Sequence, residues 1–382
     1  MTVQKAKTLT GKKEPLSNTM LLMLVSIGIF IAMYAAAVIF NAKGFRNPKM
    51  FFDLLNENSM LIIIACSLTV VMIGGGINIS VAGVVSLTCM VDALYLQKSA
   101  VASPFLNILI SLGIALGIGL AFGAFQGFLI SHLEIQPFIV TLAGMILARG
   151  LTTIVSPGGK PVDVNASGAV TAMWDARINI PWFTEVTEKV KLGKVTQTVV
   201  STDLEIGTLV ALLVLVLVFL LLRYAKLGRN IYAIGGNQQS AMMLGINVKR
   251  TRFISYVISG LLSGLAGFIF LMHAPSAKTT VAARGEMDAI AASIIGGTLL
   301  TGGVGNVFGT FFGVMILATI TKIIGLSDVN ESFWQNIASG AMLGLFIMLQ
   351  SVILSVRGKG KIHLPEWLKF IKPKGDPISP AK

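Results

Sequence analysis

Long apolar runs separated by short polar segments dominate the chain, and ten of these runs predict membrane-spanning helices. About 20 apolar residues in a helix cross the roughly 30 Å hydrocarbon core of a bilayer. Two predicted helices are short or interrupted by glycine, the second at Gly74-Gly75-Gly76 and the eighth at Gly302-Gly303. The pattern predicts an all-α integral membrane protein with about ten transmembrane helices, some of them broken by glycine. The predicted spans are residues 20–40, 58–75, 77–96, 105–130, 137–155, 206–223, 253–273, 288–301, 304–324 and 334–355.

The composition supports the membrane class. Of the 382 residues, 54% are hydrophobic and only 12% are charged, and the mean hydropathy is +0.81. Soluble domains carry about 25% charged residues, so this chain has too few to cover a water-facing surface. The net charge of +13 does not indicate nucleic-acid binding, because the basic residues lie between apolar runs. Cys66 and Cys89 lie inside apolar runs and predict buried, unpaired thiols.

The basic residues predict the orientation of the chain. Residues 223–252 hold six Lys and Arg and no Asp or Glu. Because short basic segments stay in the cytoplasm, both termini are expected on the cytoplasmic side. The predicted organisation is a cytoplasmic segment 1–18, a transmembrane domain 19–355 with an external loop 156–205 and a cytoplasmic loop 224–252, and a cytoplasmic tail 356–382. The external loop is expected to pack as a small subdomain, either to contact an external delivery protein or as a variable surface loop.

Residue types suited to catalysis or metal binding are scarce. His132, His273 and His363 are far apart and lack metal-ligand spacing. No glycine-rich loop has the spacing of a nucleotide-binding loop, so ATP would have to bind to another subunit. Ionisable residues within the predicted spans are few, whereas ion-coupled carriers usually need charged groups near the bilayer midplane. This scarcity disfavours a secondary transporter and suits an uncharged, polyhydroxylated substrate.

Two glycine-rich breaks carry polar side chains at membrane depth. In the first, Gly76 precedes Asn78 and Ser80, and in the second, Gly297 precedes Asn306. Non-helical backbone at this depth is tolerated where it is buried in protein or lines an aqueous cavity. These five residues are therefore candidates for the substrate pathway. A tight turn at the first break and close helix packing at the second would explain them without transport. One break in each half of the chain also suggests an internal repeat.

A short helix is predicted within the cytoplasmic loop, at residues 237–245. Asn237 is a good N-cap, and Gly245 is a good helix terminator. The apolar residues between them include Ala241, Met242 and Leu244. An isolated helix of this length is not stable in water, so it must pack either on the span ends or on a partner protein.

Four ordered motifs resemble the bacterial sugar ABC importer permeases of the ribose, xylose and galactose group. The resemblance covers most of the chain, from the second span to the tenth, and residues 329–335 are slightly more similar to the galactose-type members. The motifs are Gly75–Val81, Gln136–Leu142 followed by Arg149-Gly150, the segment 228–247, and Gly285–Ala292 running on to Gly296-Gly297 and Gly302-Gly303.

This resemblance implies a permease of the bacterial inner membrane, expected as a homodimer, with a cytoplasmic ATP-binding subunit and an external sugar-binding protein as partners. ATP and magnesium would bind to the ATPase, and this chain would hold no cofactor. Glu286 and Asp288 would lie at the outer mouth, near the binding protein. The residues expected to dock on the ATPase are Asn237, Gln238, Gln239, Ala241, Met242, Leu244 and Gly245.

Two other function classes stay open at this point. One is an ion- or proton-coupled secondary transporter or channel for a small polar solute. The other is a membrane-embedded enzyme, which is the least favoured because the sequence shows no metal, nucleophile or acid–base cluster.

Overall fold

The structure is a computed structural model that describes residues 18–39, 44–99, 103–164, 177–191, 194–326 and 331–357. The predicted cytoplasmic segment before residue 18 and the tail after residue 357 lie outside the described residues. So does part of the stretch 329–335.

Apolar helices make up most of the described structure. Seven of them are long and apolar enough to cross a membrane. The bent pair α2 (Lys49–Glu57) and α3 (Ser59–Ile73) adds an eighth if the two helices form one span. This confirms an all-helical, multi-pass membrane protein, although the predicted count of about ten spans is not confirmed. The seven helices are α1 (Asn18–Ile39), α4 (Val81–Lys98), α5 (Pro104–Ser131), α6 (Pro137–Val155), α8 (Ile206–Tyr224), α11 (Val248–His273) and α13 (Val307–Gly325).

The predicted second and eighth spans differ most from the structure. The second begins earlier than predicted, because α2 precedes α3 and the two helices meet at an angle of 58°. The predicted span 288–301 is instead α12 (Gly285–Ile295), which has 11 residues and ends at Gly296. At 1.5 Å per residue α12 is about 16 Å long, which is too short to cross a bilayer. The run of apolar residues continues past Gly296, so hydropathy alone did not show this end.

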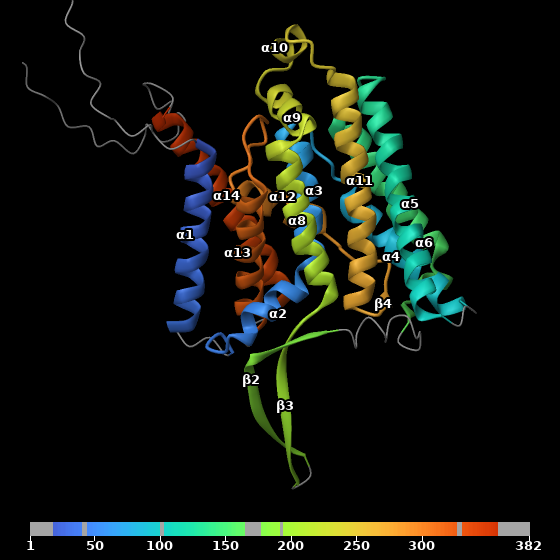
Figure 1. Ribbon diagram of the computed structural model, residues 1–382, viewed down its shortest axis with the longest axis vertical. Coiled ribbons are helices and arrows are strands. Elements are labelled where there is room, and N and C mark those ends of the chain that lie inside the picture. Colours follow the sequence, from blue (N-terminus) through green and yellow to red (C-terminus); the bar gives the residue numbers. More distant parts are fainter. Residues whose placement is uncertain are drawn as a thin grey trace, which may run out of the picture.

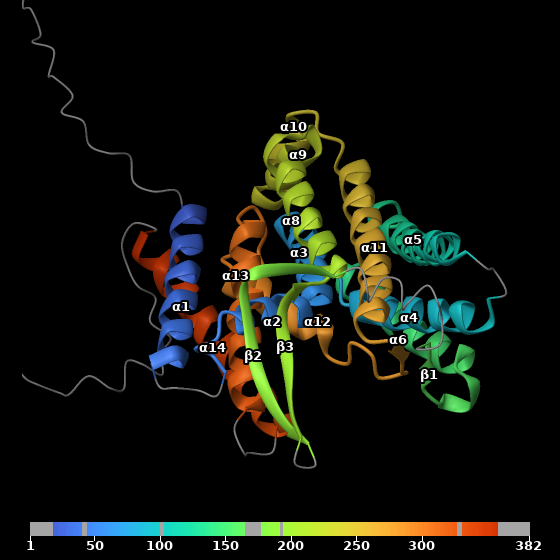
Figure 2. The same cartoon turned by 60° about the horizontal axis from the view of Figure 1, so that its bottom comes forward.

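The helical bundle has two distinct ends (Figure 1). One end carries α9 (Lys226–Gly236) and α10 (Gln238–Met243), and the other carries a hairpin of β2 (Ile178–Lys191) and β3 (Lys194–Leu204). The first turn of α1 and the last turn of α14 (Glu331–Arg357) lie toward the α10 end. Figure 2 shows α1 and α14 on one side of the bundle and α4, α5 and α6 on the other.

In its described part, the loop that was predicted to be external contains a β-hairpin. Strands β2 and β3 pair antiparallel, with an irregular register between Ile180 and Glu185. Before the hairpin, the 3-10 turn η1 (Pro157–Gly159) leads into β1 (Val162–Asp163), which pairs with β4 (Ser276–Ala277) after α11. The β1–β4 pairing holds the start of the loop against the end of the bundle opposite α10.

Helix α3 forms the centre of the core, and almost all of its residues are buried. It packs against α8, α11, α12 and α13. The pair α5 and α11 packs with backbones in contact, because glycines of both helices face each other. A Cβ atom on Gly123 of α5 would lie 2.7 Å from the carbonyl oxygen of Tyr256 on α11. Small residues permit such close packing of membrane helices. Cys66 and Cys89 are buried and unpaired, as predicted.

Candidate translocation pathway and coupling helix

The helices α3 and α12 end at paired glycines in the same way. Gly75 and Gly297 have φ values of +75° and +91°, which glycine adopts without steric cost. Two hydrogen bonds then close each helix end in the geometry of the Schellman motif. These bonds run from the amides of Gly75 to Met72, Gly76 to Val71, Gly297 to Ile294 and Thr298 to Ser293, at 2.9–3.0 Å.

An asparagine precedes the helix that follows each break. Asn78 Oδ1 accepts a hydrogen bond from the Ser80 amide at 3.1 Å, just before α4. Asn306 Oδ1 accepts one from the Phe308 amide at 2.9 Å, at the start of α13. The two breaks thus share a glycine-terminated helix followed by an asparagine whose side chain accepts from the amide two residues later, although only Asn306 is the N-cap of its helix. This similarity supports the predicted internal repeat.

Asn78 and Ser80 belong to a buried polar network between α3, α5 and α11. They are 2% and 1% exposed. Asn78 Nδ2 donates to Ser259 Oγ at 2.9 Å, and Ser80 Oγ lies 2.9 Å from Gln126 Oε1. Ser259 Oγ also lies 2.7 Å from Ser67 Oγ on α3. These side chains hydrogen-bond to one another inside the protein, and the buried Gln126 Nε2 has no hydrogen-bond partner among the described residues.

A second buried polar cluster joins α3, α12 and α13. Thr69 Oγ1 lies 2.8 Å from Thr310 Oγ1 and 3.2 Å from Ser293 Oγ, and all three side chains are fully buried. The sequence did not point to this cluster, because Thr69 lies more than 200 residues from both Ser293 and Thr310 in the chain. Hydroxyl-to-hydroxyl hydrogen bonds of this kind hold membrane helices together.

The other predicted pathway residues lie in different places. Gly76 lies beside Asn78, where a Cβ atom would be 2.6 Å from the Tyr256 hydroxyl. Gly297 packs against Leu22 of α1, and Asn306 lines a cleft at the α10 end of the bundle. The structure therefore brings Gly76, Asn78 and Ser80 together and separates them from Gly297 and Asn306.

Three Gly-Gly pairs from distant segments meet beside the end of α3. A Cβ atom on Gly302 would lie 2.8 Å from Gly75 Cα, and one on Gly303 would lie 2.8 Å from Gly236 Cα. The Gly303 amide also donates to the carbonyl of Ile73 at 2.8 Å. We call this site the glycine junction, because only glycines let the three backbones approach so closely. Its pairs are Gly74-Gly75 after α3, Gly235-Gly236 at the end of α9, and Gly302-Gly303 between α12 and α13.

The predicted cytoplasmic helix is present as α10, and both of its predicted ends are confirmed. Asn237 caps it, since Oδ1 accepts a hydrogen bond from the Ser240 amide at 2.9 Å. Gly245 has a φ of +78°, and its amide donates to the Met242 carbonyl at 2.9 Å. The helix is short, with six residues. It follows α9 directly and lies at the tip of the bundle (Figure 1).

The apolar side chains of this helix divide into an anchor and an exposed surface. Ala241 is buried against Ile234 and Val248. Met242, Met243 and Leu244 are 50%, 89% and 79% exposed. We call these last three residues the apolar tip. Met243 was absent from the predicted docking residues, although it is the most exposed of them.

The polar residues of α10 are also exposed. Gln238 accepts a hydrogen bond from Arg252 of α11 at 2.7 Å, and Gln239 faces solvent. Below them, a cleft of about 390 Å³ extends between α10, the α5–α6 connection and the start of α11.

A buried ion pair lies toward the hairpin end of the bundle. Arg149 Nη2 of α6 lies 3.2 Å from Glu286 Oε2 of α12, and Glu286 is 7% exposed. The carboxylate of Glu286 is therefore engaged by α6, while Asp288 is half-buried. A buried charge pair costs free energy if either partner is removed, so this contact ties α12 to α6.

A family model with the description branched-chain amino acid transport system / permease component matches residues 50–350. The chain belongs to this permease family. Among curated proteins it is 34% identical over 328 residues to the inner membrane ABC transporter permease protein YjfF of Escherichia coli, covering 86% of this chain and 91% of that protein. It is 32% identical to the fructose import permease protein FruG of Bifidobacterium longum (94% and 100% covered). It is 31% identical to the ribose import permease protein RbsC of Escherichia coli (86% and 92% covered). No solved structure matches the chain.

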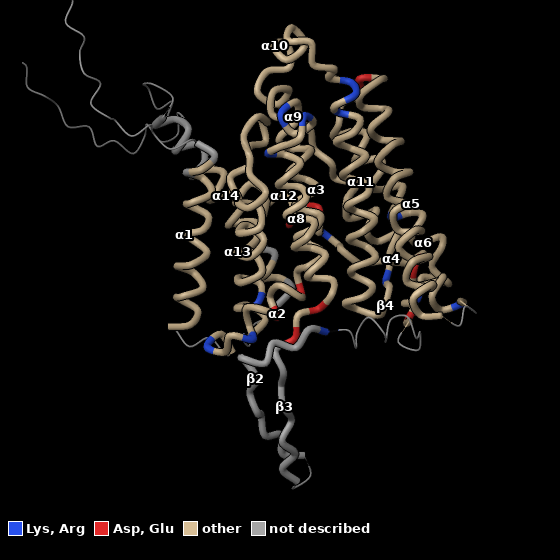
Figure 3. Tube along the Cα trace, viewed as in Figure 1, with Lys and Arg blue, Asp and Glu red and all other residues tan. Residues whose placement is uncertain are grey.

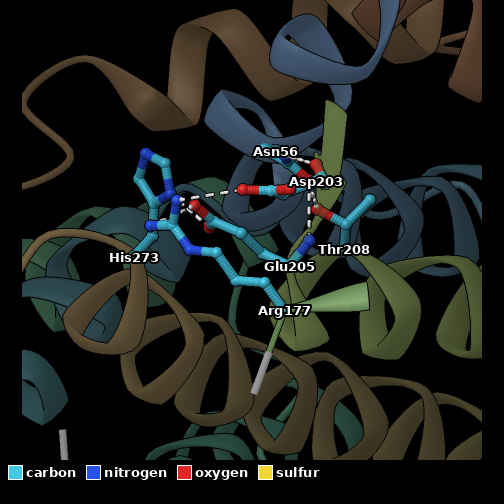
Figure 4. Close-up of polar contacts among 6 residues, drawn as sticks. All are labelled: Asn56, Arg177, Asp203, Glu205, Thr208 and His273. Atoms are coloured by element: carbon cyan, nitrogen blue, oxygen red, sulfur yellow. Dashed lines mark hydrogen bonds and ion pairs between the residues drawn. The ribbon is translucent and has the colours of Figure 1, made fainter. Parts of the chain in front are cut away.

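A polar cluster fixes the hairpin to the body of the permease (Figure 4). Glu205 accepts from His273 Nδ1 at 2.6 Å and pairs with Arg177 at 3.4 Å. Asn56 of α2 donates to the carbonyl of Asp203 at 2.8 Å, and its Oδ1 accepts from the Thr208 hydroxyl at 2.6 Å. We call these six residues the hairpin anchor. Sequence reasoning missed the hairpin anchor, because its members come from four separate segments.

Proposed function

We propose that this permease forms the membrane path of an ATP-driven importer for a monosaccharide or a similar neutral polyol. The names of its relatives support a sugar substrate, since two of them are import permeases for fructose and ribose. The neutral polar networks around Asn78 and Thr69 also support it, because amides and hydroxyls can exchange their hydrogen bonds for those of a sugar. The permease supplies the path and performs no chemistry itself.

The observation that carries this proposal is the apolar tip on α10. Three large apolar side chains are exposed on a six-residue helix that lies beyond the ends of the apolar spans. The chain itself does not cover this surface, and exposed apolar side chains clustered in this way are typical of contact sites. We infer that the contact is with a partner protein. The tip, together with Asn237, Gln238, Gln239 and Gly245, docks on a cytoplasmic ATPase subunit. ATP and magnesium bind to that subunit.

The glycine junction then passes the movement of α10 to the broken helices. Helix α9 leads directly into α10, and its end touches both the end of α3 and the loop before α13. Closely packed backbones have no flexible side chains between them, so a shift of α9 displaces its neighbours. The breaks at Gly76 and Gly297, with Asn78, Ser80 and Asn306, are the places where the path opens.

The charges at the two ends of the molecule support an orientation in the membrane, and this orientation indicates where the remaining partners bind. Basic residues gather at the α9–α11 end, whereas basic and acidic residues are mixed around α2 (Figure 3). This distribution supports a cytoplasmic α10 end, with both termini in the cytoplasm of a bacterial cell and the hairpin outside the inner membrane. An external sugar-binding protein contacts the hairpin side, near Glu286 and Asp288. A second copy of the permease completes the path as a homodimer.

Co-purification with the ATPase tests the proposal. We expect Met243→Glu/Leu244→Glu to abolish ATPase association, because two carboxylates would be buried in an apolar contact. The variant should insert and melt as the parent does, since both side chains are exposed. Lys226→Gln, an exposed change on α9, is the matched control and should retain association. ATPase association in the Glu variant equal to that of the control would remove α10 from the docking role.

One observation favours the ion-coupled alternative. Asp92 of α4 is fully buried, and neither carboxylate oxygen has a hydrogen-bond partner among the described residues. Buried ionisable groups in membrane spans often serve in ion or proton transfer. Uptake into vesicles decides between the two functions. An ATP-driven importer requires internal ATP and is insensitive to an ionophore, whereas a coupled carrier shows the opposite behaviour.

A further inference from the structure

A cleft of about 620 Å³ opens between α8, α9 and the start of α13. This volume lies within the range of roughly 300–1,000 Å³ that is usual for ligand pockets. Its walls include Phe219, Leu222, Arg223, Tyr224, Arg229 and Tyr232. The cleft begins in the last turns of α8, so it lies where that span reaches the membrane interface at the α10 end.

The position of the cleft along the membrane normal follows from the lengths of the two helices, α8 and α13, that line it. Helices α8 and α13 each have 19 residues, which is about 28 Å and matches the hydrocarbon thickness. One helix ends and the other begins at the cleft, so both place it at the same membrane surface. Tyr224 and Tyr232 lie there too, and tyrosine is enriched at this level of a bilayer.

The polar side of the cleft favours an anion. Arg223 and Arg229 both line it, and no Asp or Glu is among its lining residues in the described part of the chain. Arg229 donates to the carbonyl of Tyr224 at 2.9 Å, which fixes the guanidinium at the rim. Tyr232 donates to the carbonyl of Gly305 at 2.8 Å and joins the two walls. Two guanidinium groups at one rim are suited to a phosphate group.

The other side of the cleft favours hydrocarbon. The ring of Phe219 packs edge-on against Phe308, with centroids 4.7 Å apart, and forms an apolar floor. Below it, the outer face of α8 exposes Leu213, Leu217 and Leu220. A soluble phosphate would use only the rim, whereas a molecule with both a phosphate and acyl chains would use the rim, the floor and the α8 face.

We propose that this cleft binds the headgroup of an anionic phospholipid from the leaflet at the α10 end. The phosphate lies between Arg223 and Arg229, and the acyl chains follow the outer face of α8. The hydrogen bond between Tyr232 and Gly305 joins α9 to the loop before α13. Both segments continue into the glycine junction, so the lipid stabilises the side of the cleft that is connected to it. The inference requires the α10 end to lie at a membrane surface, and it is independent of the transported solute.

Native mass spectrometry of the delipidated full chain tests this inference. We expect one tightly retained phosphatidylglycerol and no retained phosphatidylcholine. Each basic residue near a bilayer contributes about 1 kcal/mol toward an anionic lipid, so Arg223→Gln/Arg229→Gln should weaken binding about thirty-fold. Arg223→Gln alone should weaken it about five-fold, and it leaves the Arg229 hydrogen bond intact. Lys249→Gln/Arg250→Gln removes two exposed charges at the same end of the bundle and should bind as the parent does.

Three results would overturn the proposal. Equal retention of phosphatidylcholine would show that charge does not matter. Displacement by glycerol phosphate at the same concentration as by phosphatidylglycerol would identify the ligand as a soluble phosphate. Unchanged binding in Arg223→Gln, with a melting temperature equal to that of the parent, would place the lipid elsewhere. None of these results bears on the ATPase contact, which is measured separately by co-purification.

Discussion

Gly235→Ala is the most direct probe of the glycine junction. A Cβ atom at Gly235 would overlap the carbonyl oxygen of Ile73 and the amide nitrogen of Gly303. Those two atoms form the 2.8 Å hydrogen bond that joins the end of α3 to the loop before α13. The substitution therefore places a methyl group where it overlaps both atoms of the hydrogen bond between Gly303 and Ile73.

The expected energy follows from two effects. Relief of the overlap requires a backbone shift on the order of 1 Å, and such overpacking costs about 1–3 kcal/mol. Weakening of the hydrogen bond costs about 0.5–1.5 kcal/mol more. If about 2 kcal/mol of this cost falls on only one of the two conformations between which the permease alternates, the ratio of their populations changes about thirty-fold.

Sugar uptake and sugar-stimulated ATP hydrolysis by the reconstituted complex measure this effect. We expect Gly235→Ala to melt several degrees below the parent and to lose most of its uptake, while the ATPase still co-purifies through α10. Gly236→Ala is the matched control, since a Cβ atom there would meet nothing within 4 Å. That variant should equal the parent or be more stable, because alanine favours helix over glycine by up to about 1 kcal/mol.

Identical behaviour of Gly235→Ala and Gly236→Ala would contradict the proposed role of the glycine junction. Equal melting temperatures would mean that the three backbones are farther apart than the junction requires. Reduced stability with normal uptake and normally coupled ATP hydrolysis would leave the junction as a packing feature only.

Three further predictions concern other buried polar groups. Asn78→Leu should reduce uptake at least tenfold in an assembled complex, because it removes the hydrogen bonds of Asn78 to Ser259 and to the hydroxyl and amide of Ser80 at the break; normal uptake would return the break to a structural role. Asp92→Asn should retain ATP-driven uptake and raise the melting temperature. The reason is that it removes a buried charge that has no partner among the described residues. Loss of uptake with a normal melting curve would instead favour ion coupling. Asn56→Leu should open the hairpin anchor, destabilise the protein by about 2–4 kcal/mol and so lower its melting temperature. Asn58→Leu, at the bend after α2, is the variant for comparison, and equal melting temperatures of the two variants would contradict the prediction.

The sequence predicted local features well, because they depend on residues close in the chain. The apolar runs located most spans, and Asn237 and Gly245 marked the ends of α10. The sequence also marked both glycine breaks. It did not show that α12 stops at Gly296, because a buried half-helix and a full span are equally apolar.

Features built from distant segments were beyond sequence reasoning. The hairpin anchor joins Asn56 to Asp203 and Thr208, and the cluster at Thr69 joins three helices. Polar residues at such positions look unremarkable when each is considered with its neighbours in sequence. Likewise, Glu286 was assigned to the outer mouth from its position in a motif, and only the fold shows its pairing with Arg149.

The two helix breaks differ in a way that assigns them different tasks. The first break holds Asn78 and Ser80 within a hydrogen-bonded network, so opening it requires replacement partners such as sugar hydroxyls. The second break reaches α1 through Gly297 and α9 through Gly303, and its polar cap on α13 lines a cleft at the membrane surface. We therefore propose that movement of α10 acts on the second break and on the end of α3, whereas the solute acts on the first break. Because both breaks contact α3 within one turn of its end, solute binding and movement of α10 would then act on the same helix, and each would bias the other.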